Sequence, residues 1–174
     1  MHYKRIDLQG RDKMIIDTMA VLAYLLGDDA GHNKKIILDV PLSQISQATN
    51  TNPAIYWKNI PPEAASLALV IKEITIFQKP IYYWVVYNLP VDSTGFQAGQ
   101  SNQTSKNNIG LNSWGQKNYH RLIYPAQNDL ALIEIYALDK KFSTIKNITG
   151  AQLERKMNGH VLASGTYQLS FGGN

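Results

Sequence analysis

The sequence predicts a mainly β protein, an antiparallel or mixed β-sandwich with a few short helices. Runs of β-branched and aromatic residues recur from residue 35 onward, with turn-forming residues between them, whereas helical periodicity appears in only two segments. Strands that follow one another with few helices between them favour a sandwich over a doubly wound parallel sheet. The 174 residues, 44% of them hydrophobic, suffice for one ordinary globular domain without disulfides or metals.

The first element is an amphipathic helix over residues 12–26, predicted by apolar residues at helical spacing and ended by Gly27. It is too short to span a bilayer, which takes about twenty apolar residues, and Asp17 interrupts it. A degraded signal sequence is the alternative interpretation, because basic residues precede the segment. We expect residues 1–33 to form an atypical N-terminal extension and residues 34–174 the main domain. The expected location is cytoplasmic, with the periplasm and secretion as alternatives.

The remaining elements follow in order. Strands are expected over residues 35–40, 66–77, 81–89, 130–138 and 161–171. A stretch rich in Gly, Ser, Asn and Gln over residues 93–118 predicts a long surface excursion. Residues 149–157 predict a short helix with Thr149 as its cap and Gly159 just beyond its end. Trp57 and Trp84 lie in strand runs, where large rings are usually buried.

Composition excludes several classes of function. The chain has no cysteine, which rules out disulfides, thiolate metal sites and cysteine nucleophiles. Its net charge of +4 comes from scattered pairs of basic residues without a nucleic-acid motif, so a solvated basic surface is expected and no nucleic-acid partner. The sequence contains neither a G-x-S-x-G elbow nor histidines at metal-ligand spacing. We therefore expect a protein that is not an enzyme and has no cofactor or metal.

Four segments share a pattern of aromatic, proline and glycine residues with a known family. They are Asn52-Pro53-Ala54-Ile55-Tyr56-Trp57 with Pro61; Tyr83-Trp84-Val85-Val86-Tyr87-Asn88-Leu89-Pro90; Asn112-Ser113-Trp114-Gly115 through Tyr119 to Pro125, leading into Ile135-Tyr136-Ala137-Leu138-Asp139; and Met157-Asn158-Gly159-His160-Val161-Leu162-Ala163. In the same order they resemble the S-P-x-L-x-W…P, H-W-V-V-Y-N-L-P, N-x-x-G-x-x-x-Y-x-G-P-x-P-P with Y-A-L-D, and M-x-G-H-V-L-A motifs of the phosphatidylethanolamine-binding protein family. The bacterial and archaeal, Raf kinase inhibitor-like members are the most similar. The resemblance covers residues 35–170 and implies a β-sandwich of that family's type.

The resemblance also implies a pocket for a small anionic or phosphorylated group, here altered at each of its elements. The family builds that pocket from a D-P-D-A-P segment, the histidine of H-W-V-V and a later H-R-Y. In this sequence Glu73 alone retains a carboxylate at the first element, Tyr83 replaces the histidine, and Asp129 stands at the third. An imidazole that is replaced by tyrosine keeps a hydrogen-bond donor but loses a titratable positive charge.

New basic residues accompany these changes. His120 and Arg121 lie in the proline-containing loop, and arginine offers a planar fork that suits phosphate. The ligand-binding residues implied by the resemblance are Glu73, Tyr83, Trp84, Tyr119, His120, Arg121, Tyr124, Pro125 and Asp129.

Three interpretations of this pocket stay open. It is a remodelled site for a small ligand, or a vestigial pocket, or a site that retains ordinary phospholipid-headgroup binding. If the pocket is vestigial, the alternative function is that of an interaction or regulatory protein, similar to the family's kinase and protease inhibitors. Such a protein would act through the 93–118 loop or the N-terminal helix. That helix has an apolar face that also makes a homodimer an open alternative.

Overall fold

The computed structural model describes residues 34–41, 49–74, 78–100, 108–123 and 130–169. The predicted helix over residues 12–26 and the extension over residues 1–33 lie outside the described residues. No helix within the described ranges is both long and apolar enough to cross a membrane.

The larger of two sheets has the strand order β1-β8-β7-β4-β5. Its strands are β1 (Lys34–Lys35), β8 (Val161–Leu169), β7 (Leu130–Leu138), β4 (Ser66–Ile74) and β5 (Ile81–Leu89). All neighbours are antiparallel except β1 and β8, which run parallel, so the sheet is mixed. The bounds of β5 and β7 agree with the prediction, and β4 and β8 begin at their predicted first residues.

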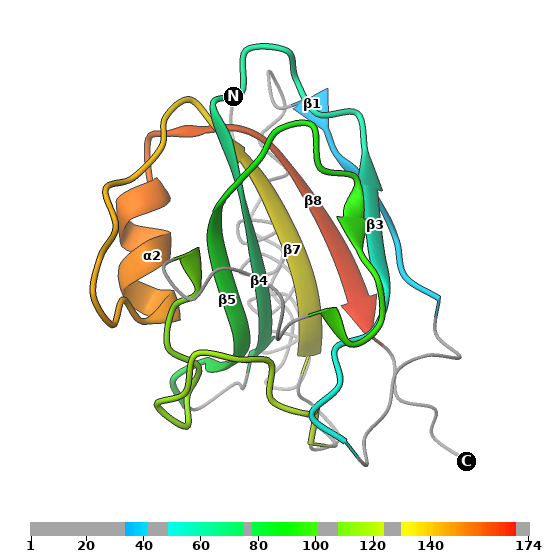
Figure 1. The fold of residues 1–174 in the computed structure, drawn as a ribbon, viewed down its shortest axis with the longest axis vertical. Helices are drawn as coiled ribbons and strands as arrows, with labels where there is room; N and C mark the ends of the chain where they lie inside the picture. The colour runs from blue at the N-terminus through cyan, green and yellow to red at the C-terminus, as the bar shows by residue number, and fades with distance from the viewer. Residues whose placement is uncertain (1–33, 42–48, 75–77, 101–107, 124–129, 170–174) are drawn as a thin grey trace, which may run out of the picture. The chain divides into compact units, whose positions relative to one another are not determined.

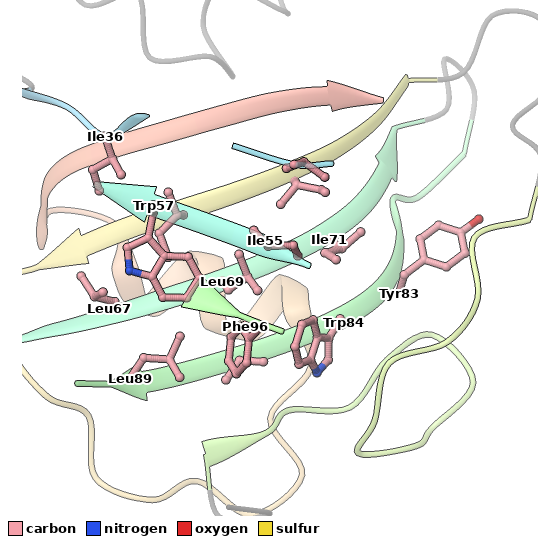
Figure 2. Close-up of a cluster of buried hydrophobic side chains, with 14 of the residues drawn as sticks. Ile36, Ile55, Trp57, Leu67, Leu69, Ile71, Tyr83, Trp84, Leu89 and Phe96 are labelled. Atoms are coloured by element: carbon pink, nitrogen blue, oxygen red, sulfur yellow. The ribbon is translucent and has the colours of Figure 1, made fainter. Parts of the chain in front are cut away.

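The smaller sheet packs over one face of the larger one. It has the antiparallel order β2-β3-β6, with β2 (Ile37–Asp39), β3 (Ile55–Lys58) and β6 (Gly95–Phe96). Alternate residues of β4, among them Leu67, Leu69 and Ile71, meet Trp57 and Phe96 in the main core (Figure 2). Together with the mixed larger sheet, this arrangement confirms the predicted mainly β sandwich.

The opposite face of the larger sheet is covered by α2 (Gly150–Met157), which Figure 1 shows beside β5. Thr149 and Gln152 form a capping box at its start: the Thr149 Oγ1 atom accepts from the Gln152 N–H, and the Gln152 side chain accepts from the Thr149 N–H. Leu153 and Met157 bury the inner side of α2 in a second core cluster. The predicted helix is therefore confirmed, and Thr149 is its N-cap.

The described residues of the 93–118 segment are mostly exposed or half-buried, as expected for a surface excursion, but the segment also contributes to the fold. It contains β6, and its side chains Phe96, Ile109 and Asn112 are buried. Beyond residue 107 the chain returns to β5, where Ile109 forms an isolated bridge with Val86. The edge strand of a sheet presents unpaired N–H and C=O groups, and this segment supplies partners for them.

Candidate functional site

The site is built around a β-bulge in β5. Opposite β5, Ile71 pairs with Trp84 and the next residue, Lys72, pairs with Tyr82, so Tyr83 is the additional residue of the bulge. Consecutive strand residues normally face opposite sides, but here Tyr83 and Trp84 both join the main core. Figure 2 shows Tyr83 at one end of that core, with its hydroxyl directed away from the other labelled side chains.

Tyr83 is paired with Glu73 of β4. The Tyr83 hydroxyl donates a hydrogen bond to Glu73 Oε2 at 2.5 Å, and both residues are buried. Burial raises the pKa of Tyr83 far above its usual value, and the hydrogen bond to Glu73 raises it further, although the backbone N–H of Ile123 partly offsets the rise. Tyr83 therefore stays protonated at neutral pH and acts as a donor to the carboxylate.

Residues 108–123 lie along the outer edge of β5. The N–H groups of Gly110, Ser113 and His120 donate to carbonyl oxygens of β5, each at 2.9 Å. Gly110 is required by the close approach, because a Cβ there would lie 2.7 Å from the Ile148 carbonyl oxygen. These contacts fix the position of the loop relative to Tyr83.

A turn centred on Asn112 holds Trp114. The Asn112 Oδ1 atom accepts from the N–H groups of Trp114 (3.0 Å) and Gln116 (2.9 Å), and its Nδ2 atom donates to Asn118 Oδ1 (3.1 Å). Gly115 has φ +74°, a conformation that glycine adopts without steric cost. The buried Asn112 side chain thus orders a turn whose aromatic residue faces outward.

Trp114 and His120 form a stacked pair over Tyr83. Their ring centroids are 3.6 Å apart and their planes differ by 4°. The Tyr83 ring lies 5.4 Å from Trp114 and 6.4 Å from His120, tilted against both. Trp114 is 40% exposed, whereas Tyr83 is 1% exposed. We call Tyr83, Trp114 and His120 the aromatic cluster.

The hydrogen bond of the His120 ring defines the ring's tautomer. His120 Nδ1 lies 2.9 Å from the Arg121 carbonyl oxygen, which can only accept, so Nδ1 carries a proton. In the neutral ring Nε2 is then an acceptor. The Arg121 N–H donates to Asn50 Oδ1 at 2.9 Å, and the Arg121 side chain is exposed.

Two further aromatic residues support the cluster from the core. Trp84 and Tyr119 are fully buried, with ring centroids 6.0 Å apart in an edge-to-face arrangement. Burial raises the pKa of Tyr119 to about 12, partly offset by the backbone N–H of Leu122. Trp84 also contacts Phe96, with 4.8 Å between ring centroids. Because they have no exposed surface, Trp84 and Tyr119 are positioned to shape the site rather than to contact a ligand.

Comparison with known proteins agrees with this fold. The sequence model of the family described as phosphatidylethanolamine-binding protein matches residues 32–172. The chain belongs to this family. It is 29% identical to a UPF0098 protein of Methanothermobacter thermautotrophicus over 128 residues, which is 71% of this chain and 83% of that protein. A UPF0098 protein of Chlamydia trachomatis is 28% identical over 139 residues, 74% of this chain and 90% of that protein.

Two solved structures have the same fold. The crystal structure of the phosphatidylethanolamine-binding protein homolog CT736 from Chlamydia trachomatis has a TM-score of 0.66 at 22% identity. The match covers 80% of this chain and 99% of the CT736 chain. The Escherichia coli protein YbcL, described as a new member of the mammalian phosphatidylethanolamine-binding protein family, has a TM-score of 0.66 at 15% identity. The match covers 81% of this chain and 100% of the YbcL chain.

In this family member the structure brings together three of the residues implied by the sequence: Glu73, Tyr83 and His120. Arg121 follows directly in the chain, and Trp84 and Tyr119 lie beneath in the core. The remaining three, Tyr124, Pro125 and Asp129, lie outside the described residues. The sequence interpretation missed Trp114 as a site residue. Its place in the N-x-x-G segment, close before His120, was the available signal.

A second polar cluster lies on the α2 face of the larger sheet. Lys72 Nζ lies 2.8 Å from Glu134 Oε2 and 2.7 Å from Glu154 Oε1, and the Tyr82 hydroxyl donates to Glu154 Oε2 at 2.6 Å. We call these four residues the Lys72 cluster. Burial lowers the pKa of Lys72, but the two carboxylates outweigh it and the net shift is upward. Burial raises the pKa of Glu134, although Lys72 opposes that shift.

The Lys72 cluster holds α2 to the sheet. Lys72 and Glu134 come from the central strands β4 and β7, and Glu154 comes from α2. Among the residues that the structure describes, no group of three or more His, Cys, Asp or Glu side chains is arranged to hold a metal ion. We therefore treat the Lys72 cluster as structural and the aromatic cluster as the candidate binding site.

Proposed function

We propose that this member of the phosphatidylethanolamine-binding protein family binds a small ligand at the aromatic cluster, a remodelled form of the family's pocket. The observation that carries the proposal is the geometry of Trp114. Its side chain is 40% exposed, yet it is stacked on His120 at 3.6 Å and held by the Asn112 turn. An exposed aromatic ring that is fixed before binding loses little conformational entropy when a ligand covers it.

The position of Tyr83 supports the same proposal. Tyr83 stands where the family's H-W-V-V motif has its histidine, and it lies beside the other two rings of the cluster. Its pair with the Glu73 carboxylate brings a buried polar group close to an aromatic surface. Ligand sites commonly combine such apolar walls with a few fixed polar groups.

We propose a binding role rather than catalysis. A tyrosine that acts as a base or nucleophile has to lose its proton, and burial together with Glu73 opposes that loss in Tyr83. His120 Nδ1 is engaged by a backbone carbonyl, and the ring is stacked on Trp114. These contacts fit a binding surface whose groups stay in place.

The test is an NMR screen of a small-molecule library against the full chain. We expect binding molecules to shift the Trp114 indole N–H signal and the His120 ring signals in a saturable way, and Trp114→Ala to abolish binding. Ile37→Ala serves as the matched control, because Ile37 is an equally exposed apolar residue (42%) on β2.

Two outcomes would contradict the proposal. One is a library that leaves the Trp114 and His120 signals unchanged, which would favour a vestigial pocket and a role in protein contacts. The other is a ligand that binds equally well to Trp114→Ala, which would locate binding elsewhere.

A further inference from the structure

Gly110 and Leu111, which directly precede the Asn112 turn, are held from two sides. The Gly110 N–H donates to the Val85 carbonyl oxygen of β5 at 2.9 Å, whereas the Leu111 N–H donates to the Ile148 carbonyl oxygen at 2.7 Å. Each backbone donor thus has its own acceptor, on a different neighbouring segment. The turn is therefore supported by β5 on one side and by the chain around Ile148 on the other.

Ile148 belongs to the chain that enters α2. Thr149 is the N-cap of the helix and forms a parallel bridge with Leu111. The Ile148 side chain is fully buried and lies in the same core cluster as Leu153 and Met157 of α2. The position of α2 therefore determines the position of the Ile148 carbonyl oxygen, which accepts the hydrogen bond from Leu111.

Glu154 holds α2 on the larger sheet through both of its carboxylate oxygens. Its Oε1 atom lies 2.7 Å from Lys72 Nζ, and its Oε2 atom accepts from the Tyr82 hydroxyl at 2.6 Å. Hydrogen bonds to ionised groups are stronger than those between neutral groups. The Tyr82 ring also packs directly on Gly150, where a Cβ atom would clash with it. Because an eight-residue helix is too short to be stable alone, α2 depends on such contacts.

Tyr82 also contacts the turn itself. Its N–H donates to Ser113 Oγ at 2.8 Å, and its carbonyl oxygen accepts from the Ser113 N–H at 2.9 Å. The same residue thus contacts the Glu154 carboxylate with its side chain and the residue after Asn112 with its backbone. Glu154 is therefore linked to the turn by two routes, one through Ile148 and one through Tyr82.

We propose that Glu154 is a positioning residue of the candidate binding site. By docking α2 on Lys72 and Tyr82, it fixes the Asn112 turn and thereby the place of Trp114. This inference rests on the proposed function, since it makes ligand affinity at the aromatic cluster depend on a residue of the Lys72 cluster. It adds a role in the site to a cluster that otherwise stabilises the fold.

The experiment compares wild type with Glu154→Ala by NMR, on the full chain and without ligand. We expect the Leu111 amide to exchange its hydrogen about tenfold faster in the variant, because its acceptor moves with α2. The Gly110 amide is bonded to β5 and should change by less than about twofold. The backbone order parameter of Trp114 should fall below the value of about 0.85 that is typical of rigid backbone. Lys156→Ala, at an exposed position of the same helix, is the matched control and should leave all three unchanged.

Two outcomes would overturn the inference. Equal acceleration of exchange at Gly110 and Leu111 would indicate a global loss of stability. An unchanged order parameter at Trp114 would show that the site does not depend on Glu154. Either outcome leaves the proposed function intact, because the library screen with Trp114→Ala tests ligand binding separately.

Two further variants separate positioning from a general loss of packing. Glu154→Gln keeps a side-chain oxygen of the same reach, so we expect smaller changes at Leu111 and Trp114 than in Glu154→Ala. Tyr82→Phe removes one of the two hydrogen bonds and keeps the ring against Gly150, and it should act in the same direction. If Glu154→Ala does not fold, Tyr82→Phe decides: unchanged exchange at Leu111 and unchanged order at Trp114 would overturn the inference.

Discussion

The Tyr83 hydroxyl and the Glu73 carboxylate form a 2.5 Å hydrogen bond between adjacent strands, at a point where the bulge in β5 turns Tyr83 toward the core. This pair belongs both to the larger sheet and to the candidate site. Its tyrosine ring contacts Trp114, and its carboxylate belongs to β4, a central strand of the larger sheet. Changes to the pair should therefore affect both stability and binding.

Tyr83→Phe should lower the free energy of unfolding by about 1–3 kcal/mol, because it removes a hydrogen-bond donor from a buried carboxylate. Tyr56→Phe is the matched control. Its hydroxyl donates to Gln97 Oε1 at 2.8 Å on the exposed surface, and its loss should cost less than about 0.5 kcal/mol. Urea denaturation measures both, and equal costs for the two variants would contradict the importance of the buried pair.

Lys72→Met should destabilise the protein by about 3–5 kcal/mol, since it leaves the buried Glu134 without its cation. Lys156→Met on the exposed side of α2 removes the same charge and should change stability by less than about 0.5 kcal/mol. Denaturation of both variants tests the Lys72 cluster. A cost below 1 kcal/mol for Lys72→Met, with the protein folded, would be inconsistent with a tight buried ion pair.

The pH dependence of stability should reveal Glu134. Its pKa is raised in the folded protein, so the folded state holds the proton more tightly than the unfolded state does. The stability that comes from this tighter proton binding is fully present below the ordinary pKa of 4.5. It is lost as the pH rises through the pKa that Glu134 has in the folded protein. The free energy of unfolding of the wild type should therefore fall relative to Glu134→Gln as the pH rises from 4.5 toward neutrality. A difference between the two that does not vary with pH would contradict this assignment.

Asn112→Ala should loosen Trp114, because it removes the acceptor of two backbone N–H groups in the turn. NMR relaxation should show the backbone order parameter at Trp114 falling from about 0.85 toward 0.6. Asn88→Ala removes a comparable pair of hydrogen bonds to Phe142 at the other end of β5, and should leave Trp114 unaffected. Equal loosening of Trp114 in both variants would indicate a global effect.

The fold could be predicted from the sequence because its strongest signals are local. The density of β-branched and aromatic residues defines β5 and β7 within their own segments, and Thr149 with Gln152 defines the start of α2. The site could be predicted only in part. The stacking of Trp114 on His120 depends on the Asn112 turn and on pairing with β5, neither of which appears in local periodicity.

The Lys72 cluster illustrates the same limit. Lys72 stands out in an apolar strand, but its partners Glu134 and Glu154 lie on β7 and α2. Their meeting depends on strand order and on where α2 packs, which residue spacing alone does not give. Lys72 directly precedes Glu73 in the sequence, and the structure has the two side chains on opposite faces of the sheet.

The central claim is that the aromatic cluster binds a ligand, and a crystal structure of the full chain soaked with a molecule found in the library screen tests it most directly. The account predicts ordered density for that molecule against the exposed surface of Trp114. Density for that molecule elsewhere on the protein, or a cluster left empty at saturating concentration, would contradict it.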